Sequence, residues 1–169
     1  KANLINVIGA KNLAKVCKES NTILLHISTD FVFDGDSSKF GMTKGYTEED
    51  QPNPTGVYGQ TKLDGEKAIQ STFENYYIIR TSWVYSQFGN NFMKTMLRLA
   101  SERDTLSVVS DQIGTPTNAV DLAEVLIKII ESCHAELVSA SNYGIYNFSN
   151  EGQCSWYDFA KEIFHQKGV

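Results

Sequence analysis

Residues 23–30 read Ile-Leu-Leu-His-Ile-Ser-Thr-Asp, and this stretch decides the fold class. Its nearly unbroken apolar run is typical of a parallel β-strand that is covered on both faces. A loop rich in Gly, Ser, Asp, Glu and Pro follows over residues 34–55, and its length predicts a functional role. A helix is then predicted from about residue 57 to residue 73. Strand, loop and helix in this order indicate half of a βαβ unit.

The rest of the chain continues this alternation. Apolar spacing predicts a helix over residues 5–17, and a capping box (Ser155-x-x-Asp158) opens a last helix that ends near Gly168. Further strands are predicted at 76–84, near 106–109 and at 145–148, and further helices at 92–102 and 120–131. This pattern predicts an α/β fold with a parallel sheet, whose ligands bind at the carboxyl ends of the strands. Those ends carry residues 28–30 and 81–83.

Composition excludes several classes of protein. The 169 residues include 15 Lys and Arg against 20 Asp and Glu, which gives a formal charge of −5 and disfavours nucleic acid and anionic membranes as partners. With 41% hydrophobic and 21% charged residues, the chain can bury a core. No stretch approaches the roughly 20 apolar residues of a membrane span. Asn3 and Asn6 argue against a signal peptide, so we expect one soluble domain over residues 1–169.

Cysteine and histidine offer no metal constellation. Cys17, Cys133 and Cys154 lie far apart and form no Cys-x-x-Cys, so neither a disulfide framework nor a zinc site is indicated, and a reducing cytoplasm fits best. The three histidines, at positions 26, 134 and 165, are equally scattered, and we interpret each as a core or surface residue. We therefore predict no metal ligands.

Tyr58 and Lys62 are the residues that indicate chemistry. Their spacing of four places the phenol and the ammonium on one face of the predicted helix. A cation near a phenol favours the phenolate and so turns a weak acid into a usable proton donor. The alternative is a surface pair whose long side chains only cover apolar neighbours.

The context of this pair resembles a known family. A strand ending in Ser28-Thr29-Asp30, a loop and then Tyr58-Gly-Gln-Thr-Lys62 is similar to the extended short-chain dehydrogenase/reductase superfamily, and within it to the dTDP-4-dehydrorhamnose reductases. The resemblance runs through the whole chain, in the segments 26–35, 57–67, 80–85, 91–97, 111–117 and 146–157. The segment Ser149-Asn-Glu-Gly152 with Ser155-Trp-Tyr157 after it points to the rhamnose branch.

The resemblance implies roles for named residues. Tyr58 would protonate the C4 ketone oxygen while NADPH delivers a hydride, and Lys62 would lower the Tyr58 pKa and hold the nicotinamide ribose. Thr29 would orient the substrate carbonyl, with a turn residue as the alternative. The cofactor-binding residues implied are Ser28, Tyr58 and Lys62. The substrate-binding residues implied are Asp30, Trp83, Asn91 and Phe92, of which Trp83 has a purely core role as its alternative.

One departure from the family pattern concerns the cofactor. No Gly-x-x-Gly-x-x-Gly follows a strand, and the nearest pair, Gly56 and Gly59, flanks Tyr58 instead. The resemblance therefore implies a partial doubly wound, Rossmann-like sheet that lacks its first βα units, with substrate-domain segments at about 86–100 and 140–169. We expect an internal fragment that binds NADPH weakly, is inactive alone and self-associates through its open sheet edge or first helix.

The function implied is NADPH-dependent reduction of dTDP-4-dehydro-L-rhamnose by a cytoplasmic homo-oligomer that binds a dTDP-sugar. Two alternatives stay open: another sugar-nucleotide epimerase or dehydratase, and a non-catalytic regulatory subunit with a reductase-like fold. The dehydratases usually carry Asp-Glu after the strand-end Thr, whereas Asp30-Phe31 follows here. NADH in place of NADPH, and a Mg²⁺ ion at a subunit contact, cannot be read from these residues.

Overall fold

A computed structural model describes residues 1–35, 45–135 and 142–168. It divides into two compact units. Unit 1 comprises Lys1–Thr81 and Ala135–Phe148, and unit 2 comprises Ser82–His134 and Ser149–Val169. Part of the predicted loop, residues 36–44, lies outside the described residues, as do residues 136–141 and 169. The predicted assignment of segments 86–100 and 140–169 to a substrate domain stays a prediction.

Unit 1 contains a three-stranded parallel sheet. Its strands are β1 (Leu24–Thr29), β2 (Tyr76–Thr81) and β6 (Gly144–Asn147), in the order β1-β2-β6. Leu24 pairs with Tyr76 and Thr29 with Thr81, so β1 and β2 end at the same level. The α/β class with a parallel sheet is confirmed.

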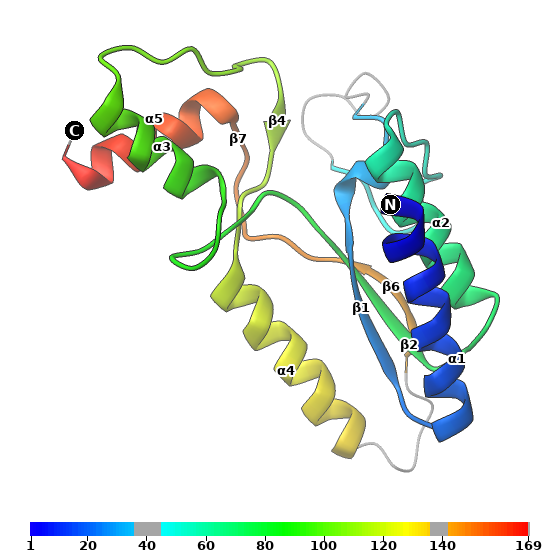
Figure 1. Ribbon diagram of the computed structural model, residues 1–169. Helices are drawn as coiled ribbons and strands as arrows, with labels where there is room; N and C mark the ends of the chain where they lie inside the picture. Colours follow the sequence, from blue (N-terminus) through cyan, green and yellow to red (C-terminus); the bar gives the residue numbers. More distant parts are fainter. Residues whose placement is uncertain (36–44, 136–141, 169) are drawn as a thin grey trace. The chain divides into compact units, whose positions relative to one another are not determined.

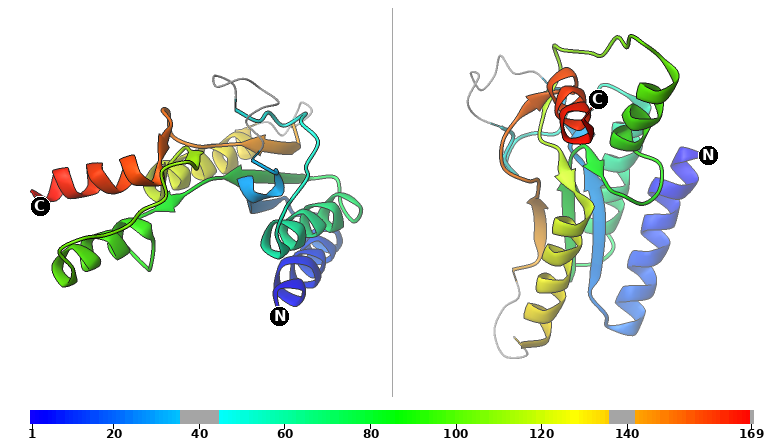
Figure 2. Two further views of the ribbon diagram at one scale, coloured as in Figure 1. Left: turned by 90° about the horizontal axis from the view of Figure 1, so that it is seen from above. Right: turned by 90° about the vertical axis from the view of Figure 1, so that its left-hand side faces the viewer.

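The helices of unit 1 lie side by side along one face of this sheet (Figures 1 and 2). They are a π-helical turn η1 (Leu4–Gly9) that continues into α1 (Ala10–Ser20), and α2 (Val57–Gln70). Gly65 lets α2 approach η1 closely, because a Cβ there would lie 2.1 Å from the carbonyl oxygen of Asn6. The core between helices and sheet consists of Ala10, Ala14, Leu24, Ile69, Phe73 and Ile78.

Unit 2 contains two short strand pairs and three helices. The parallel pair is β3 (Val84–Tyr85) with β5 (Thr117–Asn118), and the antiparallel pair is β4 (Ile113–Gly114) with β7 (Cys154–Ser155). The helices are α3 (Phe92–Glu102), α4 (Ala119–Ala135, whose last residue falls in unit 1) and α5 (Trp156–Lys167). Helices α3 and α5 pack together around Met96, Ala160 and Ile163.

Several local predictions are confirmed. The bounds of α3 match those expected, and the capping box that opens α5 is complete: the Ser155 hydroxyl accepts from the Asp158 N–H, and the Asp158 carboxylate accepts from the Ser155 N–H. Gly168 ends α5 with a φ of 73°, a left-handed conformation that suits glycine.

Two strand predictions are wrong. The strand expected over residues 76–84 ends at Thr81, because the backbone at Trp83 turns to a φ of 45° before β3 begins. The strand expected near residues 106–109 is irregular. Leu106 and Val108 pack against the apolar cluster of α3 and α5 instead of joining a sheet. In addition, α2 ends at Gln70, three residues earlier than expected.

Within the described ranges 1–35, 45–135 and 142–168, no helix combines the length and apolar character that crossing a membrane requires.

Candidate active site

The turn after β1 is built around the hydroxyl of Thr29. Its Oγ1 accepts a hydrogen bond from the Phe31 N–H at 3.2 Å and donates one to Asp30 Oδ1 at 3.1 Å. Thr29 thereby caps the short 3₁₀ helix η2 (Asp30–Val32). Burial raises the pKa of the Asp30 carboxyl, and the hydrogen bonds from Thr29 and the backbone oppose this rise.

The start of α2 packs against this turn. A Cβ at Gly59 would lie 2.0 Å from the carbonyl oxygen of Phe31, so only glycine allows the helix to come this close. The Tyr58 ring meets the Phe31 ring edge-on, with 5.8 Å between the ring centroids. Tyr58 is 53% exposed, whereas Thr29 is 6% exposed. The structure therefore brings the Thr29 turn and an accessible Tyr58 to the same end of β1.

One helical turn further along α2, Lys62 is anchored to β1. Its Nζ donates to the carbonyl oxygen of Ile27 at 2.6 Å and lies 3.5 Å from His26 Nε2. Burial lowers the pKa of Lys62, and the negative charge of Glu66 opposes this effect. Burial and the Lys62 charge lower the pKa of His26 to about 4, so His26 is neutral at pH 7.

Beneath Lys62 lies a buried pair of opposite charges. Glu66 is fully buried and Arg80 is 4% exposed, and Arg80 Nη2 donates to Glu66 Oε2 at 2.7 Å. The hydroxyl of Ser28 donates to Glu66 Oε1. The guanidinium also lies over the ring of Phe33, 5.1 Å from its centroid. The structure thus places Ser28, predicted to bind cofactor, with its hydroxyl engaged by a buried carboxylate.

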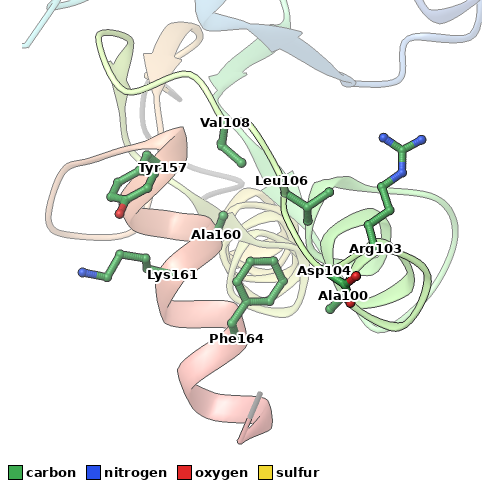
Figure 3. Close-up of a pocket in the computed structure, with 9 residues that line it drawn as sticks. All are labelled: Ala100, Arg103, Asp104, Leu106, Val108, Tyr157, Ala160, Lys161 and Phe164. Carbon is green, nitrogen blue, oxygen red and sulfur yellow. The ribbon is translucent and has the colours of Figure 1, made fainter.

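A groove of about 710 Å³ in unit 1 reaches this site. Lys62 and His26 line it together with residues of η1 and α1, namely Leu4, Ile5, Asn6, Gly9, Ala10, Asn12, Leu13 and Val16. A smaller cavity of about 260 Å³ lies in unit 2 between α3, the segment after it and α5 (Figure 3). None of the predicted site residues lines this smaller cavity, so the groove is the one that bears on the predicted chemistry.

The remaining predicted substrate residues belong to unit 2. The ring of Trp83 stacks on that of Trp156, with centroids 3.5 Å apart and planes 11° apart. Phe92 meets Trp156 at 4.5 Å, and the Asn91 side chain accepts from the Lys94 N–H to cap α3. Asp30 is the one predicted substrate residue in unit 1.

Sequence reasoning missed four residues. His26 is interpreted above as an ordinary histidine, yet it lies beside Lys62. The spacing of Glu66, four residues after Lys62, was available as a signal, whereas nothing in the sequence pairs Glu66 with Arg80 or Trp156 with Trp83. Among residues 1–35, 45–135 and 142–168, no group of three or more His, Cys, Asp or Glu side chains could hold a metal ion.

Comparison with known proteins identifies the family. The model of the RmlD substrate binding domain family matches residues 1–169. The chain belongs to this family. A related RmlD-family protein, the dTDP-4-dehydrorhamnose reductase of Aggregatibacter actinomycetemcomitans, is 47% identical over 163 residues, which are 96% of this chain and 53% of the relative.

Two solved RmlD-family structures resemble the chain closely. A dTDP-4-dehydrorhamnose reductase from Bacillus anthracis strain Ames in complex with NADP has 43% identity and a TM-score of 0.87. A dTDP-4-dehydrorhamnose reductase from Clostridium acetobutylicum ATCC 824 has 45% identity and the same TM-score. Each match covers 99% of this chain and 55% of the solved chain. The chain therefore spans about half the length of these RmlD-family relatives.

Proposed function

We propose that residues 1–169 carry the proton-transfer and sugar-binding part of an NADPH-dependent reductase that converts dTDP-4-dehydro-L-rhamnose to dTDP-L-rhamnose. The observation that carries this proposal is the arrangement at the end of β1. An exposed Tyr58 and a groove-lining Lys62 lie one turn apart on α2, whose start packs against the Thr29 turn. Family membership supports the same activity, because the relatives named above are reductases of this sugar nucleotide.

The donor set at Lys62 fits a nicotinamide cofactor. An ammonium carries three N–H groups, and two acceptors of the described residues, Ile27 O and His26 Nε2, lie within reach of Nζ. One N–H is thus left for a ribose hydroxyl. The NADP complex of the Bacillus anthracis relative supports NADPH as this cofactor. When bound, NADPH would supply the hydride.

The chain's own residues would perform the other half of the reduction. The Tyr58 hydroxyl donates its proton to the C4 oxygen of the sugar, and the positive charge of Lys62 stabilises the phenolate that is left. The Thr29 hydroxyl, which donates to Asp30 in the structure, would donate to the substrate carbonyl and hold it in place. Asp30, Trp83, Asn91 and Phe92 are proposed to bind the sugar nucleotide, and Ser28 to lie on the cofactor side.

Replacing Tyr58 by phenylalanine tests the proposal. The experiment uses the longest native chain that contains residues 1–169 and follows NADPH oxidation with dTDP-4-dehydrorhamnose. Tyr58→Phe should lower kcat by roughly 10² to 10⁴, the contribution of a positioned acid. Tyr157→Phe is the matched control, because Tyr157 is 47% exposed and lies on α5 in unit 2.

Each outcome of this assay discriminates. Unchanged kcat in Tyr58→Phe would remove Tyr58 from the mechanism. Conversion of the sugar nucleotide without net NADPH oxidation would indicate an epimerase or dehydratase. Neither conversion nor oxidation by the unmodified protein would indicate a non-catalytic subunit.

We also propose that the protein is cytoplasmic and a homo-oligomer. The apolar side of η1 and α1 supports self-association, because Leu4, Ile5, Leu13 and Val16 are 57–66% exposed. The three free cysteines fit a reducing compartment. Light scattering tests the first statement: Leu13→Glu should lower the mass of the particle, and a monomer before substitution would contradict it. Fractionation of cells tests the second.

A further inference from the structure

Trp83 has a backbone conformation that few residues with a side chain adopt. Its φ is 45°, in the left-handed region, which disfavours an L-residue with a Cβ by about 1–2 kcal/mol. Such conformations persist where the surrounding structure enforces them, and they cluster at functional sites. The neighbours of Trp83 in unit 2 show what enforces it.

The backbone on both sides of Trp83 is tied to one segment, residues 115–117. The Ser82 hydroxyl donates to the carbonyl oxygen of Thr115 at 2.6 Å. The Thr117 N–H donates to the carbonyl oxygen of Trp83 at 3.3 Å, and Val84 pairs with Thr117 in the β3–β5 ladder. Ser82 is 7% exposed and Thr117 is fully buried, so these ties are shielded from water.

The indole itself is confined by two further residues. Trp156 covers it in a nearly parallel stack at 3.5 Å. Gly114 lies so close that a Cβ there would be 2.4 Å from the indole Cε2 and 2.5 Å from Cζ2. The β4–β7 ladder pairs Gly114 with Cys154, two residues before Trp156, and so brings both residues to the same ring.

We infer that Gly114 and Trp156 are positioning residues that hold the Trp83 indole in the orientation in which it binds the sugar. This inference rests on the proposed function, in which Trp83 contacts the substrate. Two observations separate it from ordinary core packing: the strained backbone at Trp83, and a glycine whose missing Cβ is what leaves room for the ring. Displacing the indole should then weaken substrate binding more than it slows the chemical step.

The test compares substitutions at the two positions with matched controls, in the longest native chain that contains residues 1–169. Gly114→Ala is set against Gly45→Ala, because a Cβ at Gly45 meets nothing within 4 Å. Trp156→Leu is set against Phe88→Leu, an aromatic residue of the same unit that is 72% exposed. Circular dichroism reads the stack directly, because two parallel indoles at 3.5 Å couple their transitions into a paired positive and negative band.

We expect Gly114→Ala and Trp156→Leu to lose the coupled band and to raise the KM for the sugar nucleotide about tenfold, while kcat changes less than threefold and both controls stay unchanged. Trp156→Phe should lose the band yet keep a KM near that of the unmodified protein, because a phenyl face still supports the indole. This conservative variant also keeps the test decisive if Gly114→Ala does not fold.

Two results would overturn the inference. The first is a coupled band that survives Gly114→Ala, which would show that Gly114 does not position the ring. The second is a lost band with unchanged KM in Gly114→Ala and Trp156→Leu. Unchanged KM in Trp83→Ala would instead refute the proposed sugar contact itself, and the spectra of the other variants would still report whether Gly114 and Trp156 hold the indole.

Discussion

Replacing Glu66 by glutamine should destabilise the protein strongly, because it leaves a buried cation without its counter-charge. The side chains of Glu66 and Arg80 are 0% and 3% exposed. Arg80 Nε donates to Oε1 and Oε2 at 3.1 and 3.3 Å, and Nη2 donates to Oε2 at 2.7 Å. Arg80 Nη1 is buried and has no hydrogen-bond partner among the described residues.

The size of the effect follows from this geometry. Breaking a buried ion pair by removing one partner costs about 3–5 kcal/mol, since the remaining charge keeps its desolvation penalty. Glu66→Gln should lower the free energy of unfolding by that amount in guanidinium titrations. The double variant Glu66→Met, Arg80→Met should recover most of the loss, because it buries neither charge. The control is Glu102→Gln, which removes an exposed pair with Arg98 and should change stability by less than about 1 kcal/mol.

The same substitution should also move the pH profile of turnover. Burial lowers the pKa of Lys62 and Glu66 opposes this effect, so removing the Glu66 charge lowers the Lys62 pKa further. If the ammonium form is the active one, the alkaline limb of kcat shifts to lower pH. A loss of stability below about 1 kcal/mol in Glu66→Gln, or an unmoved alkaline limb, would refute this reasoning.

Three further predictions concern the elements that frame the site. Gly59→Ala should lower both stability and kcat, since its Cβ must displace the Phe31 carbonyl and with it the Thr29 turn; thermal melts and kinetics check this, and an unaffected variant would contradict the close approach. His26 has a pKa of about 4 when folded against 6.5 as the ordinary value, so the unfolded state binds more protons between these limits and stability should fall as the pH falls from 6.5 to 4. His26→Gln should flatten that slope in melts across this range, and an unchanged slope would assign it to other groups. Ser155→Ala should cost about 1 kcal/mol by removing the cap of α5, and loss of a few tenths or less in guanidinium titrations would mean the capping box contributes little.

The sequence by itself determined those features that depend on neighbours along the chain. The apolar run at residues 23–28 predicted the buried parallel strand, and the bounds of α3 and the capping box of α5 were read from residues three or four apart. The same short range places Tyr58 and Lys62 one turn apart on α2. Helix periodicity and capping are local interactions, so a single sequence carries them.

Only the tertiary structure decided what lies around those residues. Glu66 and Arg80 are 14 positions apart, and nothing local requires a buried carboxylate to meet a guanidinium until β2 lies beside β1 under α2. His26 acquires its lowered pKa only because folding buries it beside Lys62. The turn at Trp83 ended a strand that β-propensity alone would have continued, because contacts from residues 115–117, together with the packing of Gly114 and Trp156, hold a backbone that local preference disfavours. Contacts between distant segments form only when the whole chain packs, and they override local preference where burial and charge pairing outweigh it.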